Sequence, residues 1–188
     1  PDLRFGYELV NLSDLLANSE FKVFSGAIAQ GGSVRAINVK GGAKFSRKEI
    51  DALVEYVKTY RAKGLAWLKQ TSDTEFSSSY AKFLSDEENA AIRERMKVEA
   101  GDLVLIVADK NKVVFDALGA LRCECARRMG ILRSDDYKFL WVTEFPLLEY
   151  DEEEGRFYAM HHPFTSPMDE DLQYLDSDPG RVRAKAYD

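Results

Sequence analysis

Two neighbouring histidines are the residues of this sequence whose type and position most directly suggest chemistry. His161 and His162, the only histidines among 188 residues, lie in the segment AMHHPFTSP. A histidine offers N–H donors and becomes cationic beside a carboxylate, so at a strand end it can bind an anionic ligand. Adjacent side chains of an extended segment point to opposite faces, so only one of the pair is expected to reach such a ligand. The alternative is structural: one ring packs against nearby aromatic residues and the other is solvated.

A second candidate is the basic segment NVKGGAKFSRKE, which contains Lys40, Lys44, Arg47 and Lys48 at the start of a predicted helix. Free N–H groups and the helix dipole make such a terminus attractive to phosphate. The spacing of a P-loop is absent, so RNA backbone at Lys44, Arg47 and Lys48 is favoured over a bound nucleotide. The alternative is an ordinary strand-to-helix turn with solvated side chains.

Other charged groups allow weaker interpretations. Arg122, Arg127, Arg128 and Arg133 lie near the end of a long predicted helix, where cations complement the negative end of the dipole. A phosphate-binding edge is the alternative there. The acidic run at residues 151–154 lacks the spacing of an EF-hand and is interpreted as a solvated turn.

The sequence offers neither a nucleophile paired with a base nor a metal triad, so no catalytic residue and no metal ligand is assigned. Cys123 and Cys125 are two positions apart in a predicted helix and do not face each other. We therefore expect no disulfide and no shared metal, which fits a reducing compartment.

The elements that must position these residues form an α+β fold. Residues 21–130 predict the order β-β-α-β-(α)-β-α in a compact two-layer domain. Its first two strands, FKVFSGAIA and SVRAINVK, are expected to form a hairpin around QGG. Capping boxes at Ser46/Glu49 and Ser85/Glu88 begin two helices, which are expected to end at Gly64 and near Ala100.

The two ends of the chain differ from this central part. Residues 1–20 predict a connector and a short helix capped by Ser13. Beyond residue 133, DYKFLWVTEFPLLEY and GRFYAMHHPF predict a long antiparallel hairpin around the acidic turn. The chain begins at Pro1 without methionine, so we expect a piece of a longer protein.

The composition is that of a globular protein, with 45% hydrophobic and 31% charged residues. The net charge of -6 argues against a surface that binds nucleic acid everywhere, although it permits a local basic patch. Apolar runs stay short of the ~20 residues that span a bilayer. We expect a cytoplasmic protein that does not enter membranes.

Several motifs together resemble one family. PDLRFG, INVKGGAKFSRKEIDAL, GDLVLIVADKNKVV, FLWVTEFPLLEYDEEEGRFYAMHHPFTSP and DPGRVRAKAYD follow one another as in bacterial-type aspartyl-tRNA synthetases. The resemblance implies a connector from the catalytic core at residues 1–20 and a GAD-type insertion domain at 21–133. It also implies part of a class II catalytic domain at 134–188, whose hairpin belongs to the catalytic sheet. Glu144 stands where the family pattern has aspartate.

The resemblance also implies a function for the longer protein. Such enzymes are cytoplasmic homodimers that use ATP and Mg²⁺ to activate L-aspartate and transfer it to tRNA(Asp). Carried over to this sequence, the resemblance makes His161 the residue that contacts substrate aspartate, with a weaker claim for His162. The family's ATP-binding motifs fall outside these 188 residues, so the chain alone is expected to bind no cofactor and to be inactive.

One alternative remains from a different class of protein. The GAD-type domain also occurs in one subunit of tRNA-dependent amidotransferases, where the chain would be a non-catalytic module that binds tRNA or protein. The segment at residues 139–167 favours the synthetase, because its motif belongs to the catalytic sheet of that family.

Overall fold

The structure, a computed structural model, describes residues 2–151, 153–162 and 164–187. Its contacts divide the chain into two compact units, Pro1–Lys138 and Phe139–Asp188. The two units are described separately below. Four residues named in the predictions lie outside the described ones. They are the outer domain bounds, Pro1 and Asp188, and two residues of predicted turns, Glu152 and Pro163.

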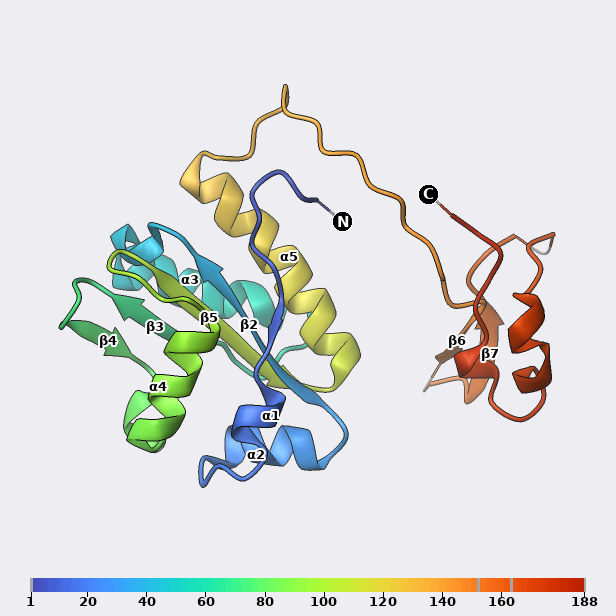
Figure 1. Cartoon of the computed structure of the whole chain (residues 1–188), viewed down its shortest axis with the longest axis horizontal. Helices are drawn as coiled ribbons and strands as arrows, with labels where there is room; N and C mark the ends of the chain where they lie inside the picture. Colours follow the sequence, from blue (N-terminus) through green and yellow to red (C-terminus); the bar gives the residue numbers. More distant parts are fainter. Residues whose placement is uncertain (1, 152, 163, 188) are drawn as a thin grey trace. The chain divides into compact units, whose positions relative to one another are not determined.

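The first unit is built on a five-stranded antiparallel sheet (Figure 1). Its strands lie in the order β1-β2-β5-β3-β4. Their bounds are Val10–Asn11 for β1, Ser33–Val39 for β2, Ala66–Gln70 for β3, Phe76–Ser78 for β4 and Leu103–Asp109 for β5. β5 pairs with β2 on one side and with β3 on the other, so the strand richest in aliphatic residues is the central one.

Helices cover both faces of this sheet (Figure 1). α3 (Arg47–Lys58) and α5 (Asn111–Met129) pack on one face. α1 (Ser13–Leu16), α2 (Lys22–Ala29) and α4 (Asp86–Arg95) pack on the other. Successive β5 side chains enter alternate cores: Leu103, Leu105 and Val107 face α3 and α5, while Val104 and Ile106 face the opposite side. The α+β class is confirmed, but the unit has three layers and not the predicted two.

The extra layer arises because FKVFSGAIA is the helix α2 and not a strand. Phe21, Phe24 and Ile28 recur at intervals of three and four, which places them on one helical face. Phe24 is buried, with its ring centroid 4.9 Å from that of Phe21 and 5.9 Å from that of Tyr80. Val23, one position before Phe24, is exposed. The predicted hairpin around QGG is therefore wrong.

Helix starts are predicted better than helix ends. Both capping boxes are present, at Ser46/Glu49 and at Ser85/Glu88. α3 nevertheless ends at Lys58, because Arg61 adopts a left-handed conformation (φ 68°) and the N–H of Ala62 donates back to Val57. α4 likewise stops at Arg95 and not near residue 100. α5 ends at Met129 and is capped by Gly130 with φ 71°, the residue at which the helix was expected to close.

Two short elements differ from expectation. Ser13 does not cap α1; it is the first helical residue, and its hydroxyl accepts the N–H of Val34 at 2.9 Å. The polar loop after β3 contains the strand β4, where the Ser78 hydroxyl donates to the Trp67 carbonyl and the Ser79 hydroxyl accepts the Trp67 N–H. Serine side chains thus replace part of the backbone pairing at this edge.

The second unit contains a short hairpin, β6 (Leu148–Asp151) and β7 (Arg156–Ala159). Two 3-10 turns, η3 (Asp169–Tyr174) and η4 (Pro179–Arg181), follow it. The antiparallel hairpin is confirmed, but its strands are much shorter than predicted. Further 3-10 turns in the first unit are η1 (Gly42–Lys44) and η2 (Ala81–Phe83).

The predicted division into residues 1–20, 21–133 and 134–188 stays a prediction. Contacts separate the chain only between Lys138 and Phe139. Residues 10 and 11, within the predicted connector, pair with β2 as strand β1. Cys123 and Cys125 are both free, and burial raises the pKa of the Cys125 thiol to about 12.

Candidate substrate and RNA sites

His161 lies just beyond β7 in the second unit. The backbone N–H of Met160 donates to the carbonyl of Leu147 at 3.0 Å, which fixes the strand end before the histidine. The His161 ring is half-buried and meets the Phe145 ring edge-on, with 5.2 Å between centroids. Its Nε2 is shielded from solvent and has no hydrogen-bond partner among the described residues. A shielded ring nitrogen without a partner is a group that gains from a polar ligand.

His162 has different surroundings. Its ring is exposed and lies 4.6 Å from the Phe164 ring, and its Nδ1 accepts the Phe164 N–H at 3.3 Å. An accepting Nδ1 places the proton of a neutral imidazole on Nε2, which makes Nε2 a donor. The two rings therefore contact different neighbours, and the structure does not bring them together as one pair of ligands.

The chain segment before β6 that carries Phe145 is held by the chain near residue 183. Phe145 accepts the N–H of Ala184 at 2.7 Å, and the N–H of Leu147 donates to Val182 at 2.8 Å. Between these bonds the Arg183 side chain points to a group of carboxylates. This cross-connection positions the ring that packs on His161.

Arg183 is an ion-pair centre that sequence reasoning missed. Its Nε lies 2.7 Å from Asp171 Oδ2, and its Nη1 lies 2.9 Å from Glu144 Oε1. The hydrogen bonds from the Arg183 side chain and backbone lower the pKa of Asp171 to about 2. Glu144, at the position where the resemblance leads one to expect aspartate, has a left-handed backbone (φ 60°). Arg183 is 12 residues from Asp171 and 39 residues from Glu144, and no local sequence pattern indicates ion pairs over such separations.

The predicted RNA patch at the start of α3 is only partly available. Lys44 and Lys48 are exposed beside the helix start. Arg47 is also exposed, but its Nε lies 2.9 Å from Asp51 and its guanidinium lies 5.0 Å from the centre of the Trp67 ring. Two lysines remain as the contact groups of this patch.

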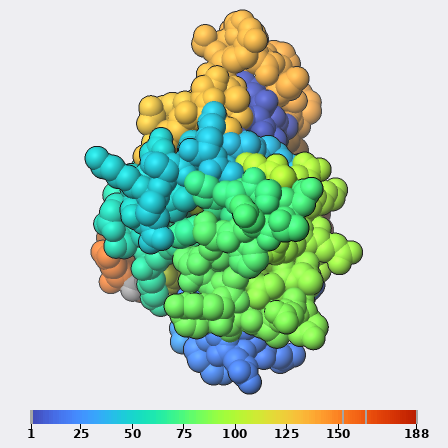
Figure 2. All heavy atoms as spheres, turned by 90° about the vertical axis from the view of Figure 1, so that its left-hand side faces the viewer, coloured from blue at the N-terminus to red at the C-terminus, as the bar shows by residue number. Residues whose placement is uncertain are grey.

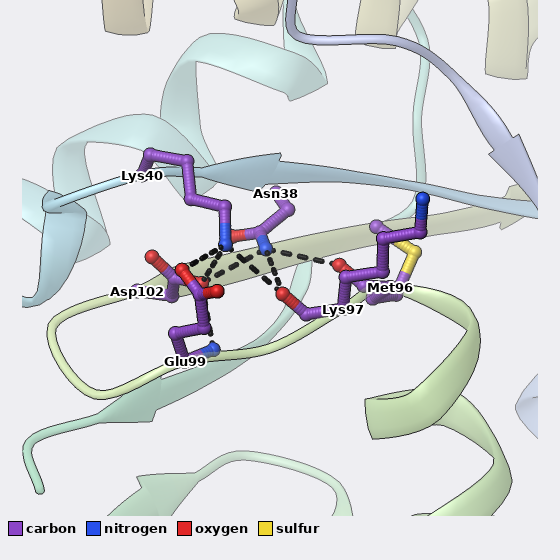
Figure 3. Close-up of polar contacts among 6 residues, drawn as sticks. All are labelled: Asn38, Lys40, Met96, Lys97, Glu99 and Asp102. Atoms are coloured by element: carbon purple, nitrogen blue, oxygen red, sulfur yellow. Dashed lines mark hydrogen bonds and ion pairs between the residues drawn. The ribbon is translucent and has the colours of Figure 1, made fainter.

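Lys40 belongs to a different cluster, drawn in Figure 3. Its ammonium lies 2.8 Å from Asp102 and 2.9 Å from Glu99, and it donates to the Lys97 carbonyl at 3.0 Å. The buried Asp102 carboxylate also accepts from Asn38 and from the Glu99 N–H. Burial alone would raise the pKa of Asp102, but the hydrogen bonds from Lys40, Glu99 and Asn38 outweigh it and lower that pKa. Lys40 therefore ties β2 to the loop before β5.

The four arginines near the end of α5 have protein partners. Arg122 is buried and donates to the Tyr7 carbonyl at 2.7 Å. Arg127 and Arg128 both bind Glu124, and the hydrogen bond from Arg127, followed by that from Arg128, lowers the pKa of Glu124 to about 2. Arg133 pairs with Asp135 at 2.7 Å. These pairs, and not the helix dipole alone, account for the cluster.

The acidic turn closes on itself. Asp151 Oδ1 accepts the backbone N–H groups of Glu153 and Glu154 at 2.8 and 3.0 Å. This side-chain-to-backbone pattern is that of a local turn. Over residues 2–151, 153–162 and 164–187, no group of three or more His, Cys, Asp or Glu side chains is arranged to hold a metal ion.

Comparison with known proteins identifies relatives along the whole chain. The chain is 70% identical over all 188 residues to the aspartate–tRNA ligase of Ruminiclostridium cellulolyticum. It is 59% identical, also over 188 residues, to the aspartate–tRNA ligase of Clostridium botulinum strain Kyoto. In each case the chain spans 32% of the relative's length.

The GAD domain model matches residues 24–118 of the 188. The match runs from α2 to the first half of α5, and so covers all but the first strand of the five-stranded sheet. Within the described residues, the structure contains no helix long and apolar enough to cross a membrane. The chain belongs to the GAD domain family.

Proposed function

We propose that this chain is part of an aspartate–tRNA ligase, which activates L-aspartate with ATP and transfers it to tRNA(Asp). The observation that carries the proposal is 70% identity over all 188 residues to a protein of that name. The identity extends through the second unit, which the GAD match does not reach. This extent supports the ligase over a GAD module of another protein class.

Within that function, His161 is the residue proposed to contact the substrate aspartate. Its shielded Nε2 lacks a partner among the described residues, and a carboxylate would supply one. The Phe145 ring against its edge limits how the imidazole can rotate. His162 is exposed and is proposed only to line the same neighbourhood.

The reaction requires ATP and Mg²⁺, which supply the leaving group and neutralise phosphate charge. The resemblance to bacterial-type synthetases puts the family's ATP-binding motifs outside these 188 residues, so we propose that ATP and Mg²⁺ bind to the remainder of the longer protein. Cytoplasmic location and a homodimeric assembly belong to the same proposal and rest on the resemblance to bacterial-type synthetases.

The test is aspartate-dependent ATP–pyrophosphate exchange by the longer protein. His161→Ala should raise the KM for aspartate about 10- to 100-fold, because a hydrogen bond to a charged group contributes roughly 1.5–3 kcal/mol. The KM for ATP should stay nearly constant. His162→Ala provides the matched comparison and should have a smaller effect. Equal KM values for His161→Ala and the unmodified enzyme would remove His161 from the aspartate site.

The 188-residue chain alone should show no exchange. Measurable aspartate-dependent exchange by this chain would contradict the placement of the ATP site elsewhere.

A contact of Lys44 and Lys48 with tRNA backbone is the second proposal. Arg47 is already engaged by Asp51, so the double variant Lys44→Gln/Lys48→Gln is the informative one. Removing two phosphate contacts should weaken tRNA binding and lower the slope of affinity against salt by about 2. Lys58→Gln/Lys63→Gln, with Lys58 at the other end of α3 and Lys63 beyond it, makes the same change in charge and should leave the slope unchanged. The same slope in both double variants would exclude the patch.

A further inference from the structure

An open cavity of about 500 Å³ lies between β4 and α4 of the first unit. The green to lime surface in Figure 2 is the face on which these elements lie. Phe76, Lys82, Asp86, Asn89 and Arg93 are among the residues that line the cavity. An aromatic ring, two cations and an amide thus meet in one recess, away from the basic segment at the start of α3.

Arg93 is fixed within this cavity by two contacts. Its guanidinium carbon lies 4.1 Å from the centre of the Phe76 ring. Its Nη1 donates to Oε1 of the buried Gln70 at 2.8 Å, and the Gln70 amide in turn donates to the Ser72 carbonyl at 2.6 Å. The amide orientation is therefore set, and so is the plane of the guanidinium. A ligand meets a preformed surface and bears little of the cost of ordering a long side chain.

The chemistry of this surface suits a flat, electron-rich ring. Nucleobases stack on aromatic side chains and on guanidinium planes, and such stacking tolerates any base sequence. The Phe76 side chain is 47% exposed, so part of its ring is open to a ligand. The Lys82 ammonium supplies a positive charge for the phosphate that accompanies the base, and the Asp86 carboxylate can accept from an exocyclic amino group.

A neighbouring pair repeats the pattern. The Lys82 ammonium lies 4.9 Å from the centre of the Phe83 ring, and Phe83 is exposed while its ring stacks parallel to that of Phe21 at 5.0 Å. Aromatic rings interleaved with cations, within one short stretch of chain, are the feature that single-strand binding surfaces share.

We propose that the β4–α4 cavity binds an unpaired nucleobase of single-stranded RNA, stacked against Phe76 and Arg93. The inference rests on the proposed function in one respect, because tRNA would supply the unpaired base. It adds a contact surface that is separate from both His161 and the Lys44/Lys48 patch.

The experiment uses the 188-residue chain and a short single-stranded RNA that carries 2-aminopurine, whose fluorescence is quenched when the base stacks. Phe76→Leu should weaken binding about fivefold or more and reduce the quenching, since stacking contributes roughly 1–3 kcal/mol per base. Arg93→Lys keeps the charge but loses the planar group. It should reduce the quenching while preserving the dependence of affinity on salt.

Phe115→Leu is the matched control. Phe115 on α5 is 45% exposed and lies under Arg35 at 4.8 Å, so it shares the cation–ring geometry but does not line this cavity. Thermal unfolding of each variant verifies that its fold is retained. Phe115→Leu should bind and quench like the unmodified chain.

Three results would overturn the proposal: identical behaviour of Phe76→Leu and Phe115→Leu, equal affinity for duplex RNA, or no binding of single strands at low salt. None of these would affect the exchange assay of the longer protein, which needs no contact at this cavity. If the longer protein showed no aspartate-dependent exchange while RNA binding still depended on Phe76, the ligase proposal would be refuted and the RNA proposal would stand.

Discussion

Glu124 offers the most quantitative test of the interactions that hold α5. Its carboxylate binds Arg127 at 2.7 Å and Arg128 at 2.6 Å on the same helix. The Arg128 side chain also donates to the carbonyl of Glu49 on α3 at 3.3 Å. Glu124→Gln keeps the size of the side chain but removes the charge that both arginines share.

The expected loss follows from the pKa of Glu124. Its pKa lies at about 2, below an ordinary value of 4.5, chiefly because of the hydrogen bond from Arg127. The full difference corresponds to about 3 kcal/mol of folding free energy. Solvent screens Arg127, which is mostly exposed, so we expect Glu124→Gln to lower the free energy of unfolding by about 2 kcal/mol at pH 7.

The assay is urea unfolding of the chain and the variant at several pH values. Because the pKa is lowered in the folded state, the unfolded state binds the proton more readily as the pH falls. The stabilisation by Glu124 is therefore complete above about pH 5 and is lost as the pH falls towards about 2. The difference between the two proteins should shrink over this window, while contributions from other carboxylates cancel.

Glu55→Gln is the control. Glu55 is an exposed residue of α3 that pairs with Lys58 at 2.7 Å, and its replacement should change stability little. A Glu124→Gln variant that is as stable as Glu55→Gln at pH 7, or a difference that stays constant down to pH 2, would refute the reasoning.

Three further predictions concern the first unit and the hairpin. Gly119→Ala should raise the free energy of unfolding by about 1 kcal/mol in a thermal unfolding assay, because a Cβ at this helical position meets no atom within 4 Å. In the same assay Gly32→Ala should lower the free energy of unfolding, because its Cβ would lie 2.2 Å from the Asp109 carbonyl oxygen. Lys40→Met should cost about 2 kcal/mol in urea unfolding, since the buried Asp102 carboxylate loses its cation; no loss would contradict the pairing. Amide hydrogen exchange should be slower in β5, which is paired along both edges, than in the two-stranded β6–β7 hairpin, and the reverse order would exclude this account.

Local chemistry explains what could be predicted from the sequence. The capping boxes at Ser46 and Ser85 need only partners three residues away, so their patterns are sufficient. α2 was misassigned because its Phe, Val and Ile residues also suit a strand, and the contact between Phe24 and the distant Tyr80 favours the helix. β4 was missed because serine hydroxyls complete its pairing.

The candidate sites show the same limit. The adjacent pair His161 and His162 can be found directly in the sequence, and strand geometry predicts that the two side chains have different surroundings. The contact between Phe145 and His161 joins residues 16 apart, and the contact between Lys40 and Asp102 joins residues 62 apart. No local sequence pattern encodes contacts over such separations. The pairing of Arg93 with Phe76 was likewise absent from the sequence reading, because it depends on how α4 lies against β4.

The strand order has a consequence for synthesis of the chain. β5 is the last strand of the first unit to be made, yet it lies at the centre of the sheet between β2 and β3. Until residue 109 has left the ribosome, β2 and β3 each present an unpaired edge, and the side chains of both cores lack their central partner. The nascent unit must hold these edges apart, because a direct β2–β3 pairing would occupy the position that β5 has to enter.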